Sequence, residues 1–295
     1  MWRFLRRYDI YFLSADIAAL CTGLRPAVMV DYALGIPKLQ AQLCGLLELL
    51  AQEVMLISSL KVMCLDDVVY LIHIENLTLL MNETLNRSIK LDFIVLDDSV
   101  IRFALSSEKD EALNEFASFT TCFLSKASTA STSISGHPSS PTSGLIDLGS
   151  SELCCEAPLP TLNGWILGYP VIYFFKRENV SKAVRALSVS ALLQFKILIQ
   201  SSLVFQISEE QGLEGSSAMH SLTSFTMPSE LNGHKVAEEW ASSLQAKVQN
   251  SRFWRVEVLS NLALKLNLAT WYLWTPTLTE EGGEGGGSDL LVAVD

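Results

Sequence analysis

Short apolar runs alternate with helical periodicity in the first part of the chain. Residues 27–30 form a valine-containing apolar run that is too short for a helix, so they predict a buried strand. Apolar residues then recur at helical spacing from residue 39 to residue 54, which predicts an amphipathic helix with Pro37 in its first turn. Residues 1–23 are predicted to form a preceding helix that ends at Gly23.

The same alternation continues as far as residue 124. The elements predicted here are strands at 60–65 and 68–74, a helix at 77–89, a strand at 93–96 and a helix at 108–124. Asp66 and Asp67 join the first two strands, and such a tight acidic joint indicates a hairpin or a strand with a sharp bend. Strands and helices that alternate in this order are typical of an α/β layer.

The second half of the chain has a more antiparallel pattern. Apolar and polar positions alternate over residues 193–199, which is the period of a strand with one buried face. The other elements predicted are strands at 171–175, 203–207, 222–227 and 254–258, and an amphipathic helix at 236–248. The predicted fold class is therefore α/β (α+β), a mixed β-sheet with flanking helices and with antiparallel strands in the second half.

Polar stretches interrupt this pattern and suggest the domain organisation. Eleven of the 19 residues from Ser125 to Ser143 are Ser or Thr, so this stretch buries too little apolar surface to offset an ordering cost of roughly 1–2 kcal/mol per residue. We predict a disordered insertion at 125–160, a surface loop at 209–220 and a flexible acidic segment at 276–295. The whole chain, 1–295, is predicted to be a single α/β domain with its core at about 15–268.

The segment from Asn163 to Phe175 is aromatic and contains residues that restrict the backbone. We expect Gly168 to allow a turn and Pro170 to mark the edge of the strand that follows. Trp165 is expected to lie in the core. The segment contains no nucleophile, carboxylate or histidine, so it predicts a structural role.

The acidic net charge of the chain makes nucleic acid an unsuitable partner. The net charge is −11 over 295 residues, and phosphate binding needs a positive surface. Arg177, Lys182 and Arg185 form a small basic group after the strand at 171–175, and we interpret it as a solvated edge. We predict no nucleic-acid binding; a protein partner is compatible with the composition.

The compartment is inferred from the cysteines and from the lack of a leader pattern. Asp9 and Asp16 break the apolar run that a signal peptide would need, and no uncharged stretch is long enough for a membrane span. Glycosylation sequons at Asn76, Asn82, Asn86 and Asn179 carry little weight without a leader. Cys21, Cys44 and Cys64 fall in apolar segments, and the Cys154-Cys155 pair is a weak redox or metal candidate. A soluble protein in the reducing cytoplasm is expected.

Acidic residues follow several predicted strands and form the candidate site. Asp31 follows the strand at 27–30, and Asp97 and Asp98 follow the strand at 93–96. If these strands are parallel neighbours, their carboxylates meet at one sheet edge and could hold Mg²⁺ for phosphoryl or glycosyl transfer. The alternative is that these residues start turns and cap helices, as Asp commonly does after strands.

Other chemical motifs are missing from the sequence. It has no glycine-rich phosphate loop after a strand, no G-x-S-x-G turn and no H-E-x-x-H helix. The four histidines are scattered, and His73 is expected to be a satisfied core residue. The sequence therefore assigns no cofactor and no metal ligand set.

Several segments resemble a known family. These segments are residues 23–28 leading to Asp31-Tyr32, residues 167–173, and residues 224–228 followed by Trp240. They are similar to the uncharacterised chromosome 1 open reading frame 74 family, which is classed as a domain of unknown function. The resemblance covers about residues 15–268 and rests most on Leu-Gly-Tyr-Pro-Val at 167–171. It implies no activity, cofactor or catalytic residue.

Two functional hypotheses remain open at this point. The first is an intracellular protein whose function the sequence leaves unknown, either non-catalytic, for example an interaction module, or with an activity that the sequence does not assign. The alternative is a metal-assisted transferase or hydrolase that uses the carboxylates at the strand ends.

Overall fold

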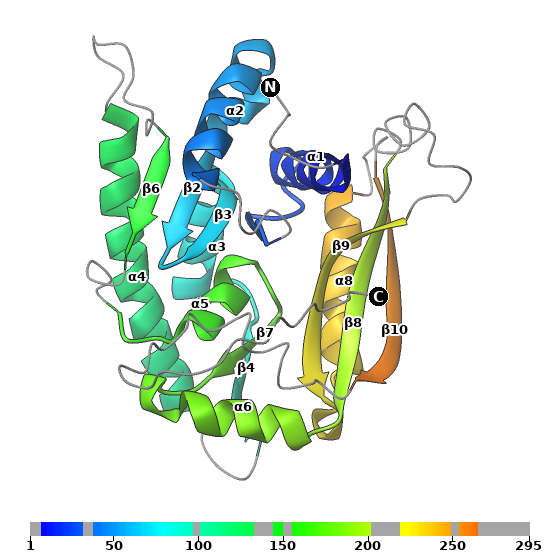
Figure 1. Cartoon of the computed structure of the whole chain (residues 1–295). Helices are drawn as coiled ribbons and strands as arrows, with labels where there is room; N and C mark the ends of the chain where they lie inside the picture. The colour runs from blue at the N-terminus through cyan, green and yellow to red at the C-terminus, as the bar shows by residue number, and fades with distance from the viewer. Residues whose placement is uncertain are drawn as a thin grey trace, which may run out of the picture.

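The computed structural model describes residues 7–31, 38–96, 101–132, 144–149, 155–201, 219–248 and 254–264. Within these ranges the strands form three sheets, and the helices pack between and around them (Figure 1). The α+β fold class is confirmed. No helix in the described ranges is long and apolar enough to cross a membrane.

The first sheet has the strand order β1-β3-β2-β6. Its strands are β1 (Ala27–Met29), β2 (Leu60–Leu65), β3 (Val68–His73) and β6 (Leu145–Leu148). β2 and β3 pair antiparallel across Asp66 and Asp67, with Asp66 at φ 52°, so the predicted hairpin is confirmed. β1 adds antiparallel to β3, and β6 adds parallel to β2.

Both faces of the first sheet are buried. One face contributes Met63, Leu65, Tyr70 and Ile72 to a central core shared with α3 (Ile74–Leu85), α4 (Ser106–Thr132) and α5 (Leu159–Ile166). The other face contributes Val62, Cys64, Val69 and Leu71 to a core shared with α1 (Arg7–Cys21) and α2 (Leu39–Glu53). Because side chains of a strand alternate between its faces, β2 and β3 supply both cores at once.

Helix α2 buries most of its predicted apolar face. Leu39, Leu43, Leu46 and Leu47 are buried against the first sheet. Val54 follows the helix in an extended conformation and is exposed, so the buried face is shorter than predicted. Leu13 of α1 is completely buried, so the core begins before residue 15.

The second sheet has the order β5-β4-β7 and separates two cores. Its strands are β5 (Arg102–Phe103), β4 (Asp92–Val95) and β7 (Val171–Phe174), and β4 pairs parallel with β7. Phe93 and Val95 face the central core, whereas Ile94 faces a third core that includes α6 (Val180–Val189).

The third sheet confirms the antiparallel second half. It has the order β10-β8-β9, made of β8 (Leu192–Ser201), β9 (Met219–Pro228) and β10 (Trp254–Leu264). β8 pairs antiparallel with both neighbours. Helix α8 (His234–Val248) lies along this sheet, with Ala237, Ala241 and Leu244 buried (Figure 1).

Part of the predicted disordered insertion is regular structure. α4 continues to Thr132, and residues 145–148 form β6, so the prediction for 125–160 was wrong in these parts. Ser128 and Thr129 donate their hydroxyls to backbone carbonyls of the preceding helical turn, which satisfies these polar groups inside the helix. Ile146 and Leu148 are buried in the central core. Residues 133–143 and 150–154 lie outside the described ranges.

Several predicted boundaries also shift. α3 begins at Ile74, before the predicted residue 77, because the His73 side chain accepts a hydrogen bond from the Asn76 amide and caps the helix. His73 is buried, which confirms its core role. Met219 and His220 belong to β9 and not to a loop. Pro37, residues 203–207, the rest of the 209–220 loop and residues 276–295 lie outside the described ranges.

Trp165 lies at the centre of the molecule, as predicted. Its ring is 1% exposed and stacks on Phe116 with a centroid distance of 4.1 Å and an interplanar angle of 3°. Phe119 meets the indole edge-on at 5.9 Å, and the indole Nε1 donates to the Thr84 hydroxyl at 3.0 Å. Nearby, the Tyr70 hydroxyl donates to Asn163 Oδ1. These contacts hold α5 against α3, α4 and β3.

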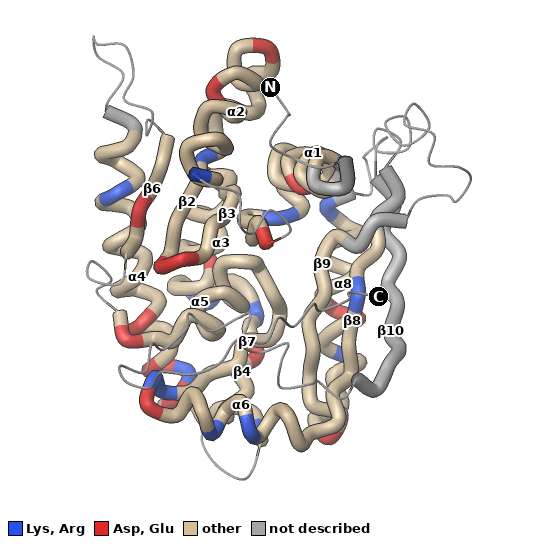
Figure 2. Tube along the Cα trace, in the orientation of Figure 1, with Lys and Arg blue, Asp and Glu red and all other residues tan. Residues whose placement is uncertain are grey.

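Charged residues of both signs lie close together along the chain trace near the start of α4 (Figure 2). Arg102 forms two hydrogen bonds to the Glu108 carboxylate, each 2.7 Å long, and the Leu105 amide donates to the same carboxylate. The hydrogen bonds from Arg102 lower the pKa of Glu108 to about 2.

Replacing Trp165 with alanine is expected to lower the free energy of unfolding by about 3–5 kcal/mol, because the cavity left behind is enclosed by packed helices. Urea unfolding followed by circular dichroism measures this loss. Trp165→Phe keeps a ring but loses the hydrogen bond to Thr84 and should cost less. An unchanged unfolding midpoint in Trp165→Ala would contradict the central role of this side chain.

The low pKa of Glu108 predicts that this residue contributes to the free energy of unfolding by an amount that depends on pH. The ionised carboxylate is preferred in the folded state, so its contribution is present above the ordinary pKa of 4.5 and is lost as the pH falls toward about 2. Since Arg102 is partly exposed, we expect its interaction with Glu108 to add about 1 kcal/mol to the free energy of unfolding at pH 6.

Urea unfolding of the wild type and Glu108→Gln at pH 6 and pH 3 tests this contribution. The difference in the free energy of unfolding between the two proteins should be about half as large at pH 3 as at pH 6. Glu111→Gln, which removes only an exposed 3.6 Å pair with Lys176, is the control and should show a smaller difference at both pH values. A difference for Glu108→Gln that is the same at both pH values would refute the assignment.

Candidate functional site

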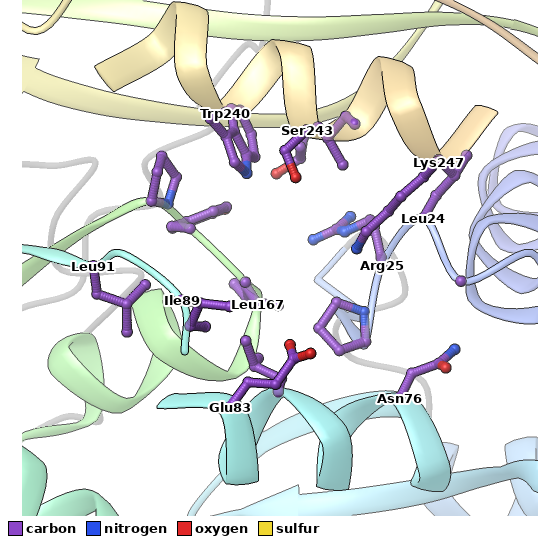
Figure 3. Close-up of a pocket in the computed structure, with 18 of the residues that line it drawn as sticks. Leu24, Arg25, Asn76, Glu83, Ile89, Leu91, Leu167, Trp240, Ser243 and Lys247 are labelled. Carbon is purple, nitrogen blue, oxygen red and sulfur yellow. The ribbon is translucent and has the colours of Figure 1, made fainter. Parts of the chain in front are cut away.

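A cavity of about 710 Å³ lies between α3 and α8. Three connecting segments complete its wall, namely residues 22–26 between α1 and β1, residues 89–92 leading into β4, and residues 167–170 between α5 and β7. Thr223 of β9 also reaches the cavity. Figure 3 shows side chains from these elements converging on one space.

Two glycine turns bring distant parts of the chain together at this cavity. Gly23 ends α1 at φ 72° and Gly168 follows α5 at φ 74°, and both conformations favour glycine. The turn at Gly168 is closed by hydrogen bonds from its own amide to the Trp165 carbonyl and from the Tyr169 amide to the Gly164 carbonyl. A Cβ on Gly168 would lie 3.3 Å from Pro26 Cδ, so the turns are in close contact. The predicted turn at Gly168 is confirmed.

Part of the cavity wall is apolar and aromatic. Trp240 and Tyr169 both pack on Phe225, which belongs to β9. Leu91, Ile89 and Leu167 line the opposite part of the cavity (Figure 3). We call these side chains, Trp240, Tyr169, Leu91, Ile89 and Leu167, the apolar wall. Such a surface can hold the body of an organic molecule.

Arg25 is the buried charge of the cavity. Only 8% of the residue is exposed, and its Nη1 donates to the Leu222 carbonyl at 2.9 Å. A guanidinium has five N–H donors, and within the described ranges Nε has no partner and no carboxylate forms an ion pair with Arg25. The side chain points into the cavity (Figure 3).

Thr223 is a second buried polar residue of the wall. It is 8% exposed, and its hydroxyl has no hydrogen-bond partner among the described residues. Because Thr223 follows Leu222, whose carbonyl accepts from Arg25, the hydroxyl and the guanidinium belong to the same part of the cavity. Buried polar atoms are rarely left unsatisfied in native proteins, so this pair marks a place where a polar partner would be stabilised.

An ion pair spans the other part of the cavity. Lys90, in the segment before β4, lies 2.9 Å from Glu239 of α8 and 3.9 Å from Asp92. Its hydrogen bond with Glu239 raises the pKa of Lys90 and lowers that of Glu239. Both side chains are exposed, so the pair links two elements 149 residues apart through a contact that solvent screens.

Glu83 and Lys247 complete the charges of the cavity. Glu83 projects from α3 toward the cavity, and Lys247 projects from α8 beside Arg25 (Figure 3). The wall therefore carries three cations, Arg25, Lys90 and Lys247, and three carboxylates, Glu83, Asp92 and Glu239. Since Lys90 pairs with Glu239 and Asp92, the remaining charges are Arg25 and Lys247 on one side and Glu83 on the other.

Asp31, the described residue of the predicted carboxylate site, does not line this cavity. Asp31 follows β1 and is exposed. β1 pairs with β3, whereas β4 pairs with β5 and β7 in a different sheet, so the parallel pairing on which the carboxylate hypothesis depended does not occur. Asp97 and Asp98 lie outside the described ranges, and their relation to Asp31 stays a prediction. The described residues contain no group of three or more His, Cys, Asp or Glu side chains suited to a metal ion.

The cysteines have the properties of core thiols. Burial raises the pKa of Cys44 and Cys155 to about 11 and that of Cys64 to about 12. These thiols are therefore protonated at neutral pH and are poor nucleophiles. Cys44 and Cys64 are buried as predicted, and Cys21 is only partly buried. Cys154 lies outside the described ranges, so the proposed pair with Cys155 stays untested.

Sequence reasoning missed the residues that line the cavity. Arg25 stands between Gly23 and Pro26 in an apolar stretch, and a charge in such a context is the one local signal that could have drawn attention to it. Thr223 and Trp240 carry no comparable signal, because their role depends on packing between distant segments. Arg177, Lys182 and Arg185 are exposed near or on α6, as expected for a solvated edge.

Comparison with known proteins adds the family but no activity. No curated protein and no solved structure is significantly similar to the chain. Parts of the segments on which the sequence resemblance rests line the cavity, namely residues 23–26, residues 167–170 and Trp240, whereas residues 224–228 do not. The model of the family described as a domain of unknown function (DUF4504) matches residues 2–270, and the chain therefore belongs to this family.

Proposed function

We propose that this protein binds a small organic molecule in the cavity between α3 and α8. The main support for the proposal is the volume of the cavity together with the kinds of residue that line it. A volume of about 710 Å³ falls within the range of roughly 300–1,000 Å³ found for small-molecule sites. Such sites typically combine an apolar wall with a few converging polar groups, and here these are Arg25, Thr223 and Glu83.

The placement of the cavity supports the same proposal. Its wall comes from both sides of the molecule, with α3 on one side and α8 and β9 on the other. A bound molecule would contact both sides and would link them in addition to the exposed ion pair between Lys90 and Glu239. Ligand binding is therefore expected to stabilise the folded protein, by about 2.7 kcal/mol at a ligand concentration 100 times the Kd.

Other predictions accompany this proposal. We infer from the segments at 23–28 and 167–173 that the chain belongs with the chromosome 1 open reading frame 74 members of its family. A single domain, a cytoplasmic location, a protein partner and the lack of nucleic-acid binding are likewise proposals. The cytoplasmic location is supported by the cysteines of the described ranges, which are free thiols.

A cavity-filling variant tests the proposed site. Ser243 and Ser242 are adjacent exposed residues of α8, but only Ser243 lines the cavity. Ligand-observed NMR with a fragment library should identify molecules that bind the wild type and also raise its melting temperature. Ser243→Trp should abolish this binding because the indole occupies the cavity.

Ser242→Trp is the matched control and should bind the same fragments as the wild type. Both variants should remain within about 0.5 kcal/mol of the wild-type stability, since the sites are on the surface of a helix. If no fragment binds, or if Ser243→Trp binds them all as tightly as the wild type does, the proposed site is wrong.

The metal hypothesis has a separate test. Because β1 and β4 lie in different sheets, we expect Asp31→Ala to leave any Mg²⁺ affinity of the protein unchanged when both proteins are titrated by calorimetry. An Mg²⁺-binding heat in the wild type that disappears in Asp31→Ala would instead support a carboxylate site at Asp31, Asp97 and Asp98.

A further inference from the structure

We propose that the ligand of the cavity is an organic monocarboxylate, with its carboxylate seated on Arg25 and Thr223 and its body along the apolar wall. This inference rests on the proposed function of the cavity and specifies the chemical class of its ligand.

Arg25 provides the first argument, because it is a buried cation without a counter-charge in contact. Burial of an ionised group is costly unless the group is paired and hydrogen-bonded. The carbonyl of Leu222 accepts one hydrogen bond from Nη1, and within the described ranges no carboxylate lies within ion-pair distance. A ligand carboxylate would supply the missing negative charge and accept from the planar guanidinium, which suits two parallel hydrogen bonds.

Thr223 provides a second, independent argument. Its hydroxyl is buried, has no partner among the described residues and lies one residue from the carbonyl that holds Arg25. A hydroxyl can donate to a carboxylate oxygen, so a ligand carboxylate that reaches the Thr223 hydroxyl as well as Arg25 would satisfy both residues. Both residues belong to the wall of the cavity before any ligand binds.

The charge balance of the cavity favours one negative charge over two. Lys90 is engaged by Glu239 and Asp92, which leaves Arg25 and Lys247 opposite Glu83. The six charged groups of the wall sum to zero, because Lys90 with Glu239 and Asp92 carries one net negative unit. A carboxylate therefore adds one negative charge beside Arg25 and Lys247, whereas a dianionic phosphate ester would add two in the same cavity as Glu83.

The rest of the cavity fits the body of such a molecule. A carboxylate group alone occupies a small fraction of about 710 Å³. Trp240 and Tyr169, both packed on Phe225, offer rigid aromatic surface, and Leu91 lies across the cavity from Trp240 (Figure 3). Burial of apolar area along these side chains would provide affinity, whereas Arg25 and Thr223 would provide selectivity.

Matched pairs of probes test the carboxylate on the full-length protein. Phenylacetate is compared with phenylacetamide and octanoate with octan-1-ol, so that each pair shares a body and differs in charge. Phenyl phosphate is the dianionic probe. By ligand-observed NMR titration, we expect at least one carboxylate to bind at least tenfold more tightly than its neutral partner and than phenyl phosphate.

Three variants assign the effect to the named residues. Arg25→Met should weaken carboxylate binding at least tenfold and leave binding of the neutral probe unchanged. Arg185→Met, which removes an exposed cation of α6 outside the cavity, is its matched control and should bind as the wild type does. Thr223→Val removes an unsatisfied hydroxyl, so it should raise the melting temperature of the free protein and weaken carboxylate binding several-fold.

Thr223→Val is expected to raise the melting temperature while it weakens carboxylate binding. This variant therefore tests the proposal even if Arg25→Met does not fold. Neutral probes that bind as tightly as the carboxylates would overturn the carboxylate assignment and leave the proposed site intact. Tighter binding of phenyl phosphate, or a Thr223→Val variant with unchanged carboxylate affinity, would also overturn it. If none of these five probes binds although library fragments bind the cavity, the carboxylate class is wrong. If library fragments do not bind either, the proposed function fails as well.

Discussion

The stacking of Trp165 on Phe116 determines where most other parts of the molecule lie. Trp165 belongs to the short helix α5, which has little stability of its own and depends on tertiary contacts. Its indole is fixed by Phe116 and Phe119 of α4 and by the Thr84 hydroxyl of α3. With α5 held in this way, the turn at Gly168 reaches Pro26, and β7 is positioned to pair with β4. The cavity exists because this turn and the segment before β1 meet at α3.

Elements whose contacts are local could be predicted from the sequence. The hairpin of β2 and β3 needs only two apolar runs and the Asp66-Asp67 joint between them. α2 and α8 follow from apolar residues at helical spacing, and the antiparallel third sheet follows from the alternation in β8. Composition was misleading for residues 125–132, where Ser128 and Thr129 donate their hydroxyls to the helix backbone and Ala127 is buried. A count of polar residues does not contain this information.

The candidate site depends on contacts that no local pattern encodes. Arg25, Glu83, Thr223 and Lys247 are spread over more than 200 residues, and only the folded chain brings them to one cavity. The carboxylate site centred on Asp31 relied on the neighbours assumed for β1. Pairing between strands distant in sequence is set by packing, and β1 joins the sheet of β3 while β4 joins that of β7. The order of the strands could therefore not be derived from the sequence around Asp31.

The exposed ion pair between Lys90 and Glu239 affects how a bound molecule would exchange between the cavity and solvent. One buried cluster joins β4, β7 and α6 to β8, β9 and α8, so packing links the two sides of the cavity, and the exposed pair adds a polar link between them. Dissolved salt screens such a contact, whereas it leaves the packing around Trp165 intact. Exchange of a bound molecule with solvent would then be governed by ionic strength and side-chain motion at the rim. It would not require any of the cores to open.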